Sequence, residues 1–334
     1  MSTYIIAEAG VNHNGSLDIA KKLIDMAKEC GADAIKFQTF KSEESTGSFA
    51  DKAEYQKEND HTDESQLDML RKLELPFSDF RILRDYCKEK EIDFISTPDG
   101  DESLQCLVDL EVPLIKIGST EVTNLGFLQK IAATGKKIIL STGMSTLGEV
   151  EYAINTLKSG GAKDFMLMHC TTDYPTATED VNLRAMITLR DAFHVPVGLS
   201  DHTLSNEAAI AAVALGAFCV EKHVTLDRAM QGPDHKASMP PNEFKQYVQS
   251  IRITENLLGD GVKKPTQREV LMMKQARRSI LAERDLSKGT VLTEDMLCFK
   301  RPGDGINMKY LPILIGRTLK RDLKRDEKIS WQDL

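Results

Sequence analysis

The chain has 334 residues, of which 41% are hydrophobic and 28% charged, and its formal net charge at pH 7 is −8. This composition is near the average of globular proteins, which excludes collagen-like and disordered classes, and the negative charge argues against a nucleic-acid-binding surface. The longest apolar run, residues 208–220, is shorter than the roughly 20 residues of a membrane-spanning helix.

Two further features of the sequence bear on where the protein works. The N-terminal residues lack the cationic stretch that opens a secretory signal peptide. The 6 cysteines occur singly, without a C-x-x-C pair, as is typical of reduced thiols. We therefore expect a soluble cytoplasmic protein that binds neither nucleic acid nor a membrane.

Eight short runs rich in β-branched residues predict strands that alternate with segments of helical periodicity. Residues 16–30 carry one apolar stripe and stop at Gly31, and residues 78–90 open with a capping-type serine, Ser78. The predicted strands are residues 4–9, 34–38, 93–96, 114–117, 137–140, 165–168, 196–199 and 218–221, and the other predicted helices are residues 182–193, 205–215 and 241–258.

Eight strand–helix units in about 260 residues are the pattern of an α/β fold of the (β/α)8 TIM-barrel type. A doubly wound open sheet is the alternative, because the alternation of strands and helices does not by itself show that the sheet closes. The absence of a Gly-x-Gly-x-x-Gly motif after the first strand favours the barrel.

The charge changes sign near the end of the predicted barrel. Residues 274–334 contain 14 Lys and Arg against 9 Asp and Glu, a net charge of +5, which leaves −13 for the residues before them. A polar segment with glycines and a proline, residues 259–266, precedes this change and is typical of a linker. We predict a barrel domain of residues 1–260, a linker of residues 261–275 and a small domain of residues 276–334.

Polar residues follow all eight predicted strands, at the end of the barrel where active sites lie. Lys36 and Lys116 each end an apolar strand, so their ammonium groups are expected at the barrel mouth; a lysine that snorkels at the rim is the alternative for either one alone. Together with hydroxyl groups at neighbouring strand ends, they predict a cradle for phosphate and carboxylate groups. The hydroxyl residues are Thr97, Ser119, Ser141, Thr172 and Ser200.

Two histidines, His202 and His223, end the seventh and eighth strands, which are neighbours in a closed barrel. Neutral imidazoles are common ligands of divalent metals, although a single buried histidine is usually satisfied by a hydrogen bond in the core. Two nitrogen ligands completed by water suit Mn²⁺ or Mg²⁺ better than structural zinc, which prefers four protein ligands. We predict a divalent cation, Mn²⁺ first, with Mg²⁺ and Co²⁺ as alternatives.

Three carboxylates are expected near this metal: Glu8, Glu121 and Glu221. Each is a candidate general acid or base, because burial raises and neighbouring lysines lower the pKa of a carboxyl group. An ion-paired structural role is the alternative for at least one of them. The loop of residues 232–235 after the eighth strand is placed to contact a polar ligand.

Short motifs recur in a fixed order along the chain. They are Asn12-His13-Asn14-Gly15, Lys36-Phe37-Gln38, Lys116-Ile117-Gly118-Ser119, Ser141-Thr142-Gly143-Met144, Ser200-Asp201-His202-Thr203, Glu221-Lys222-His223, Gly232-Pro233-Asp234 and Lys300-Arg301-Pro302-Gly303. In this order they resemble the sialic acid synthase family. The resemblance runs nearly end to end and includes a C-terminal part similar to the family's antifreeze-like (SAF) domain.

The resemblance implies an enzyme that condenses phosphoenolpyruvate with the open-chain aldehyde of an N-acylated mannosamine-type sugar, giving a nine-carbon 2-keto sugar acid and phosphate. It also implies a homodimer in which the SAF domain of one chain caps the barrel of the other. By matching positions, it assigns the metal to His202 and His223, the phosphoenolpyruvate carboxylate to Lys36 and Thr97, its phosphate to Lys116, Ser119, Ser141 and Ser200, and the acceptor sugar to Gln38, Tyr174, Asp234 and Arg301.

Two departures bear on the substrate. Thr172 stands where the family often has asparagine, and Asp99 stands where an aromatic residue often follows the third strand. They weaken the transfer of acceptor contacts but not of the metal or phosphate site. Residues 55–59 and 64–75 look more like the legionaminic acid synthase branch, whose acceptor is 2,4-diacetamido-2,4,6-trideoxymannose and whose product is N,N'-diacetyllegionaminic acid. N-acetylneuraminate and pseudaminate synthases are the alternatives.

Two other functions fit parts of the pattern. One is a Schiff-base aldolase on the same barrel, with Lys36 or Lys116 as nucleophile. The other is a protein without enzymatic activity whose SAF domain binds carbohydrate. A synthase should be inhibited by EDTA and release phosphate, whereas borohydride should trap an aldolase covalently on a pyruvate donor.

Overall fold

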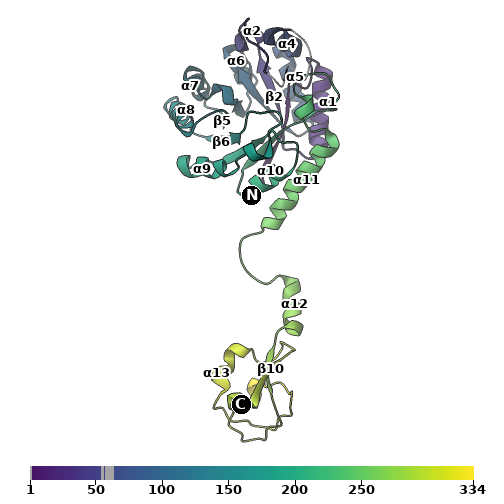
Figure 1. Cartoon of the computed structure of the whole chain (residues 1–334), viewed down its shortest axis with the longest axis vertical. Coiled ribbons are helices and arrows are strands. Elements are labelled where there is room, and N and C mark those ends of the chain that lie inside the picture. The colour runs from purple at the N-terminus through teal and green to yellow at the C-terminus, as the bar shows by residue number, and fades with distance from the viewer. Residues whose placement is uncertain (1, 54–55, 57–63) are drawn as a thin grey trace. The chain divides into compact units, whose positions relative to one another are not determined.

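The computed structural model describes residues 2–53, 56 and 64–334, so most of the segment 55–59 that entered the branch resemblance lies outside the described residues. The chain divides into two compact units, Met1–Gly259 and Asp260–Leu334. In the first unit, helices surround a core of strands (Figure 1). Within the described part of the chain, no helix is long and apolar enough to cross a membrane.

Eight parallel strands of the first unit form a closed barrel in chain order, which confirms the predicted TIM barrel over the open sheet. All of the strands except the fourth run further at their C-terminal ends than predicted, so that Thr97, Ser141 and His223 belong to strands rather than loops. The strands are β1 Tyr4–Gly10, β2 Ala34–Phe40, β3 Asp93–Asp99, β4 Leu114–Ile117, β5 Lys137–Ser141, β6 Phe165–Cys170, β7 Val197–Asp201 and β8 Cys219–His223.

Helices cover the outside of the barrel. Helix α1 begins after Ser16, whose hydroxyl accepts a hydrogen bond from the Ile19 N–H, and ends at Gly31 in the left-handed conformation with φ 88°. The described helices of this unit are α1 Leu17–Cys30, α2 Ser42–Ser45, α4 Gln66–Leu73, α5 Phe77–Glu89, α6 Asp101–Asp109, α7 Leu125–Ala133, α8 Leu147–Ser159, α9 Arg184–Phe193, α10 Glu207–Ala214 and α11 Pro241–Leu258.

The predicted N-terminal cap of one helix is wrong. Helix α5 begins at Phe77 with Pro76 as its N-cap, so Ser78 lies inside the helix and does not cap it. The proline ring holds φ at −58° and the backbone before the helix is extended, which is sufficient to start the helix without a side-chain cap.

The interior of the barrel is divided along its axis. Apolar side chains fill the part that is further from the C-terminal ends of the strands. They include Ile6, Ile95, Ile139 and Met168, all of which are buried. Outward-facing residues of the same strands pack beneath the helices in a second and larger apolar cluster. The charged residues at the C-terminal ends of the strands therefore lie next to a layer of packed apolar side chains that fills the rest of the barrel interior.

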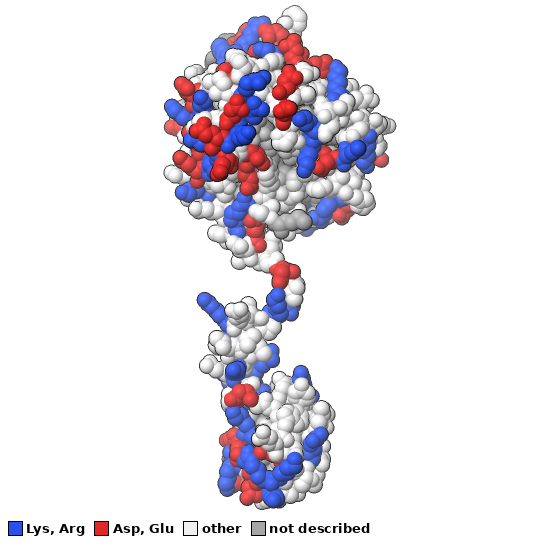
Figure 2. Space-filling model, turned by 180° about the vertical axis from the view of Figure 1, so that it is seen from behind, with Lys and Arg blue, Asp and Glu red and all other residues white. Residues whose placement is uncertain are grey.

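The second unit has a small core of its own. Strands β9 Ser279–Ala282 and β10 Leu297–Lys300 pair antiparallel, and the short helix α13 Leu311–Leu314 packs Leu314 into the core. Helix α12 Gln267–Ala276 occupies most of the predicted linker; it begins with a capping box between Thr266 and Glu269. On the face shown in Figure 2, positive and negative side chains are interspersed over the first unit rather than gathered in one patch.

Closure of the barrel at β7 depends on Gly198. A Cβ at this position would lie 2.5 Å from Cys219 Sγ and 2.6 Å from the Cys219 carbonyl oxygen. We expect Gly198→Ala to lower the free energy of unfolding by about 1–3 kcal/mol through overpacking, measured by urea unfolding followed by circular dichroism. The control is Gly148→Ala on α8, where no described atom lies within 4 Å of the added methyl group. Equal stability of Gly198→Ala and the unmodified chain would contradict this account.

Candidate active site

A cavity of about 240 Å³ opens at the C-terminal ends of the strands. Most of the residues predicted from the strand ends line it, although they come from separate parts of the chain. Those lining residues are Glu8, Lys36, Gln38, Thr97, Lys116, Ser119, Ser141, Thr172, Tyr174, Ser200, His202, Glu221 and His223.

The register of the strands brings these residues to one level. Glu8 on β1 pairs with Lys36 on β2 and with His223 on β8. Ser200 on β7 pairs with Glu221 on β8. Because successive side chains of a strand point to opposite faces, residues paired in this way project into the barrel together.

Two lysines and two glutamates form a buried ionic cluster at the floor of the cavity. Lys36 Nζ lies 2.8 Å from Glu8 Oε2 and 3.7 Å from Glu221 Oε1. Lys116 Nζ lies 3.2 Å from the same Glu221 oxygen, which also accepts a hydrogen bond from Ser200 Oγ at 3.1 Å. None of the four charged residues is more than 4% exposed. The mutual attraction of these groups offsets the cost of removing them from water.

The two carboxylates differ in their protonation. Burial raises the pKa of Glu8 to about 7, an effect that the charge of Lys36 opposes and that of Glu221 reinforces. Burial also acts to raise the pKa of Glu221, but the charges of Lys116 and Lys36 outweigh it and lower the pKa to about 2. Near neutral pH, Glu221 is ionised and Glu8 exchanges a proton, a separation typical of acid–base chemistry.

Hydroxyl groups surround Gly143 on the other side of the cavity. The Gly143 N–H donates a hydrogen bond to Ser119 Oγ at 2.9 Å. A Cβ at Gly143 would lie 2.2 Å from Thr172 Oγ1, 2.8 Å from Ser119 Oγ and 3.2 Å from Cys170 Sγ. The absence of a side chain at Gly143 therefore lets its backbone approach two hydroxyl groups closely, and these hydroxyl groups line the same cavity as the ammonium groups, a combination that suits an oxyanion.

The two histidines present nitrogen atoms to the same cavity. His202 Nδ1 donates to the Thr171 carbonyl oxygen at 2.7 Å, since a carbonyl can only accept, and Nε2 lies 3.4 Å from Ser200 Oγ. The rings of His202 and His223 have centroids 5.5 Å apart, and the Tyr174 ring lies 4.2 Å from the first. Burial lowers the pKa of His223 well below its ordinary value, so its imidazole is neutral and able to bind a cation.

These residues fit an open cation site rather than a closed cage. Among the described residues, no group of three or more His, Cys, Asp and Glu side chains is arranged to hold a metal ion. Two imidazoles in one polar cavity would leave the remaining positions of a divalent cation to water or substrate oxygens. His223 Nδ1 is buried without a hydrogen-bond partner in the described chain, so the ring is not committed to a structural role at that atom.

Three predicted residues lie elsewhere. Glu121 was expected to be a buried strand carboxylate, but it belongs to the 3-10 helix Ser119–Glu121, is only half-buried, and accepts a hydrogen bond from Asn124 Nδ2 at 2.7 Å. Asp234 is buried but does not line the cavity. Arg301 is exposed in the second unit, where Nε donates to the Ala276 carbonyl at 3.2 Å.

The structure adds lining residues that the sequence did not single out for the site. Asp99 ends β3, whose last three residues run beyond the predicted strand. Cys170 ends β6, and Met144 follows β5 with a φ of 59°. The sequence signal that could have identified them is their position at a strand end or just after it. The same signal identified the neighbouring residues of the site.

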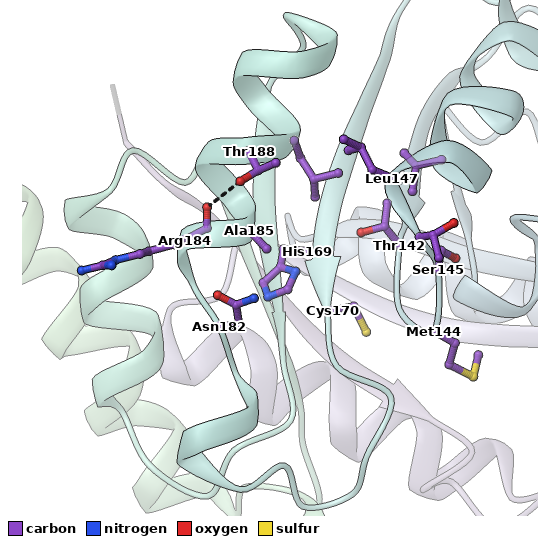
Figure 3. A pocket seen from close by; sticks show the side chains of 13 residues that line it. Thr142, Met144, Ser145, Leu147, His169, Cys170, Asn182, Arg184, Ala185 and Thr188 are labelled. Atoms are coloured by element: carbon purple, nitrogen blue, oxygen red, sulfur yellow. Dashed lines mark hydrogen bonds between the residues drawn. The ribbon is translucent and has the colours of Figure 1, made fainter.

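A second cavity of about 580 Å³ lies beside the first, between helices α8 and α9, and shares Met144 and Cys170 with it. Figure 3 shows His169 and Asn182 on one side and Leu147 on the other. Arg184 is the one charged residue among its described lining residues, and in Figure 3 its side chain points away from His169. The larger cavity therefore lacks the ionic cluster, which makes the smaller cavity the candidate active site.

Comparisons with known proteins agree with the resemblance that the motifs indicated. Residues 23–263 match the model of the NeuB family and residues 277–334 match that of the SAF domain. The chain is 47% identical over 329 residues to N,N'-diacetyllegionaminic acid synthase of Campylobacter jejuni, covering 98% of each chain. It is 44% identical over 338 residues to the synthase of the same name from Legionella pneumophila, covering 100% of this chain and 95% of that one.

A solved structure shows the same likeness. The N-acetylneuraminic acid (sialic acid) synthetase from Leptospira borgpetersenii, crystallised in complex with citrate, aligns with a TM-score of 0.73 and 34% identity. The alignment covers 82% of this chain and 90% of that chain.

The close packing of hydroxyl groups against Gly143 gives a direct test of the expected oxyanion site. We expect Gly143→Ala to weaken the binding of inorganic phosphate at least ~tenfold, equivalent to about 1.4 kcal/mol, because the added methyl group would force the hydroxyl groups of Thr172 and Ser119 out of their positions. Isothermal titration calorimetry measures this dissociation constant. Gly148→Ala on α8, which should bind phosphate as the unmodified chain does, is the control. Unchanged phosphate binding by Gly143→Ala would place the anion elsewhere.

Proposed function

The chain belongs to the NeuB family, and on that basis we propose that it condenses phosphoenolpyruvate with 2,4-diacetamido-2,4,6-trideoxymannose to give N,N'-diacetyllegionaminic acid and phosphate. The observation that carries the reaction type is the cavity in which two buried ammonium groups and several hydroxyl groups adjoin two imidazoles. The identity to synthases named for this product supports the choice of acceptor. We place the reaction in the cytoplasm.

Phosphoenolpyruvate carries two anionic groups, and the cavity offers two sets of donors. We propose that Lys36 and Thr97, whose Nζ and Oγ1 atoms are 3.4 Å apart, hold the carboxylate. Lys116 would hold the phosphate together with the hydroxyl groups of Ser119, Ser141, Thr172 and Ser200. Charge-assisted hydrogen bonds of this kind are the strong ones in a buried site.

Carbon–carbon bond formation joins C3 of phosphoenolpyruvate to the aldehyde carbon of the acceptor, whose oxygen takes up a proton. Water then adds to C2 and loses one proton, and the tetrahedral intermediate expels phosphate by breaking the bond between C2 and the bridging oxygen, while the proton of its C2 hydroxyl group passes to the departing phosphate and leaves the ketone. A divalent cation held by His202 and His223, which we propose to be Mn²⁺, would polarise the aldehyde carbonyl and favour attack on it. The lysines hold the enol ester in place while negative charge moves onto the departing phosphate.

Glu8 is suited to move the protons of this sequence. Its pKa of about 7 allows it both to accept and to donate a proton at neutral pH. Within the described chain its Oε1 atom has no hydrogen-bond partner, while Oε2 faces Lys36. We propose that Glu8 takes the proton of the attacking water, and that Glu221 stays ionised and holds the two lysines in position.

The acceptor would make contacts both inside the cavity and beside it. The cavity of about 240 Å³ is smaller than the ≈300–1,000 Å³ usual for ligand sites, so an acceptor bound beside phosphoenolpyruvate would extend beyond it. We propose that Gln38 and Tyr174 contact the sugar from within the cavity and that Asp234 contacts it from the adjoining loop. In a homodimer, the SAF domain of the second chain would cap the site and contribute the partner's Arg301.

A panel of acceptors tests the reaction. Purified protein with Mn²⁺ and phosphoenolpyruvate should release phosphate with 2,4-diacetamido-2,4,6-trideoxymannose at least ~tenfold faster than with N-acetylmannosamine or the pseudaminate precursor. EDTA should abolish the release, and borohydride with pyruvate should leave no covalent adduct on Lys36 or Lys116. Absence of phosphate release with every acceptor would overturn the proposal, and preference for another acceptor would overturn the choice of sugar.

Substitution of Arg301 tests the capping arrangement. We expect Arg301→Ala to raise KM for the acceptor at least ~tenfold, a loss of about 1.4 kcal/mol, while KM for phosphoenolpyruvate changes less than about twofold. Arg325→Ala, another exposed arginine of the same unit, is the control and should leave both constants unchanged. Equal increases of the two KM values after Arg301→Ala would rule out a specific contact with the sugar.

A further inference from the structure

A buried ionic group lies on the outer side of the barrel wall, between β7, β8 and helix α11. Lys222 Nζ is 3.1 Å from Asp201 Oδ2, and the Tyr247 hydroxyl donates to the same oxygen at 3.2 Å. Their exposed fractions are 1%, 2% and 0% in that order. The ammonium group also lies over the Tyr247 ring, 5.5 Å from its centroid. None of these three residues lines the active-site cavity.

The same group holds the backbone on both sides of His202. Lys222 Nζ donates a hydrogen bond to the Thr203 carbonyl oxygen. Asp201 Oδ1 accepts hydrogen bonds from the Thr203 N–H at 2.9 Å and from its hydroxyl at 2.8 Å. The residues before and after His202 are thus connected through a single carboxylate and a single ammonium group.

The pairing of Asp201 with Lys222 also links the backbone next to His202 to the backbone next to His223. Asp201 and Lys222 are register partners on β7 and β8, and each directly precedes one of the histidines, His202 and His223. Because side chains alternate along a strand, the ionic pair faces the helices while the imidazoles face the cavity. Any shift of β7 against β8 would change the ionic pair and the separation of the histidines together.

Stability alone does not account for charges at this place. A buried ion pair is often no more stable than apolar side chains of similar volume, although breaking one by removing a single partner is costly. Apolar neighbours such as Phe244 and Val248 of α11 already pack in the same layer. The distinctive property of the pair is therefore its fixed geometry between two strand ends.

We propose that Asp201 and Lys222 are positioning residues, which set the separation and orientation of His202 and His223 and thereby the affinity for the divalent cation. This inference rests on the proposed function, in which the two histidines bind that cation. Residues that orient metal ligands commonly change metal affinity 10–100-fold when substituted.

The test measures metal binding by the apo protein rather than turnover. The double variant Asp201→Asn/Lys222→Met leaves no unpaired buried charge and keeps an oxygen that accepts from Thr203. We expect its dissociation constant for Mn²⁺ to rise at least ~tenfold, as measured by electron paramagnetic resonance of free Mn²⁺. Tyr247→Phe is the matched control: it removes a hydroxyl from the same group but leaves the contacts to Thr203. It should lower the thermal midpoint while its dissociation constant changes less than about twofold.

The outcomes separate this inference from the proposed function. If Mn²⁺ binds the unmodified chain but binds the folded double variant equally well, the positioning role is wrong and the metal site stands. If His202→Ala and His223→Ala bind Mn²⁺ as the unmodified chain does, the metal site is wrong and the inference falls with it. Should the double variant not fold, Asp201→Asn alone takes its place, with a raised dissociation constant expected and an unchanged one contradicting the role.

Discussion

The attraction between two buried lysines and two buried glutamates is the interaction on which the site depends. These four groups are removed from water above an apolar floor, where electrostatic interactions are stronger than at the surface. Glu221 contacts both ammonium groups through one oxygen, and their charges lower its pKa, so that it remains ionised and holds the two lysines in position. Protonation of Glu8 leaves the cluster with an excess of positive charge, which favours an anionic substrate in a chain whose net charge is negative.

Closure of the barrel is what brings these charges together. The residues involved come from β1, β2, β4 and β8, and β1 joins β8 only because the sheet is closed. An open sheet with the same strands would place Glu8 and His223 at opposite edges. The fold and the chemistry are therefore not independent: the pairing of β1 with β8 both completes the sheet and completes the site.

Most of the site could be predicted from sequence because chemistry and position coincide at the strand ends. A buried strand is easily recognised by its β-branched residues, and the polar residue that ends it is expected to lie at the barrel mouth. The position of Glu121 was predicted wrongly because the chain turns into a 3-10 helix directly after β4. Ser78 was predicted to cap α5, but Pro76 starts this helix by its ring geometry. The residues of α12 were predicted to form a linker, but a capping box can begin a helix within a polar segment.

The alternation of side chains explains why the informative motifs are so short. In Asp201-His202 and in Lys222-His223, one residue faces the helices and the next faces the cavity. Two neighbouring positions thus supply both a proposed metal ligand and the residue that we propose to position it, and no longer stretch of sequence is needed to specify them. The proposed positioning residues need a partner strand and a covering helix, here α11 with Tyr247, before their contacts exist at all. Sequence therefore identifies the reactive half of each motif from its chemistry, whereas the role of the other half becomes evident only when the strands are paired.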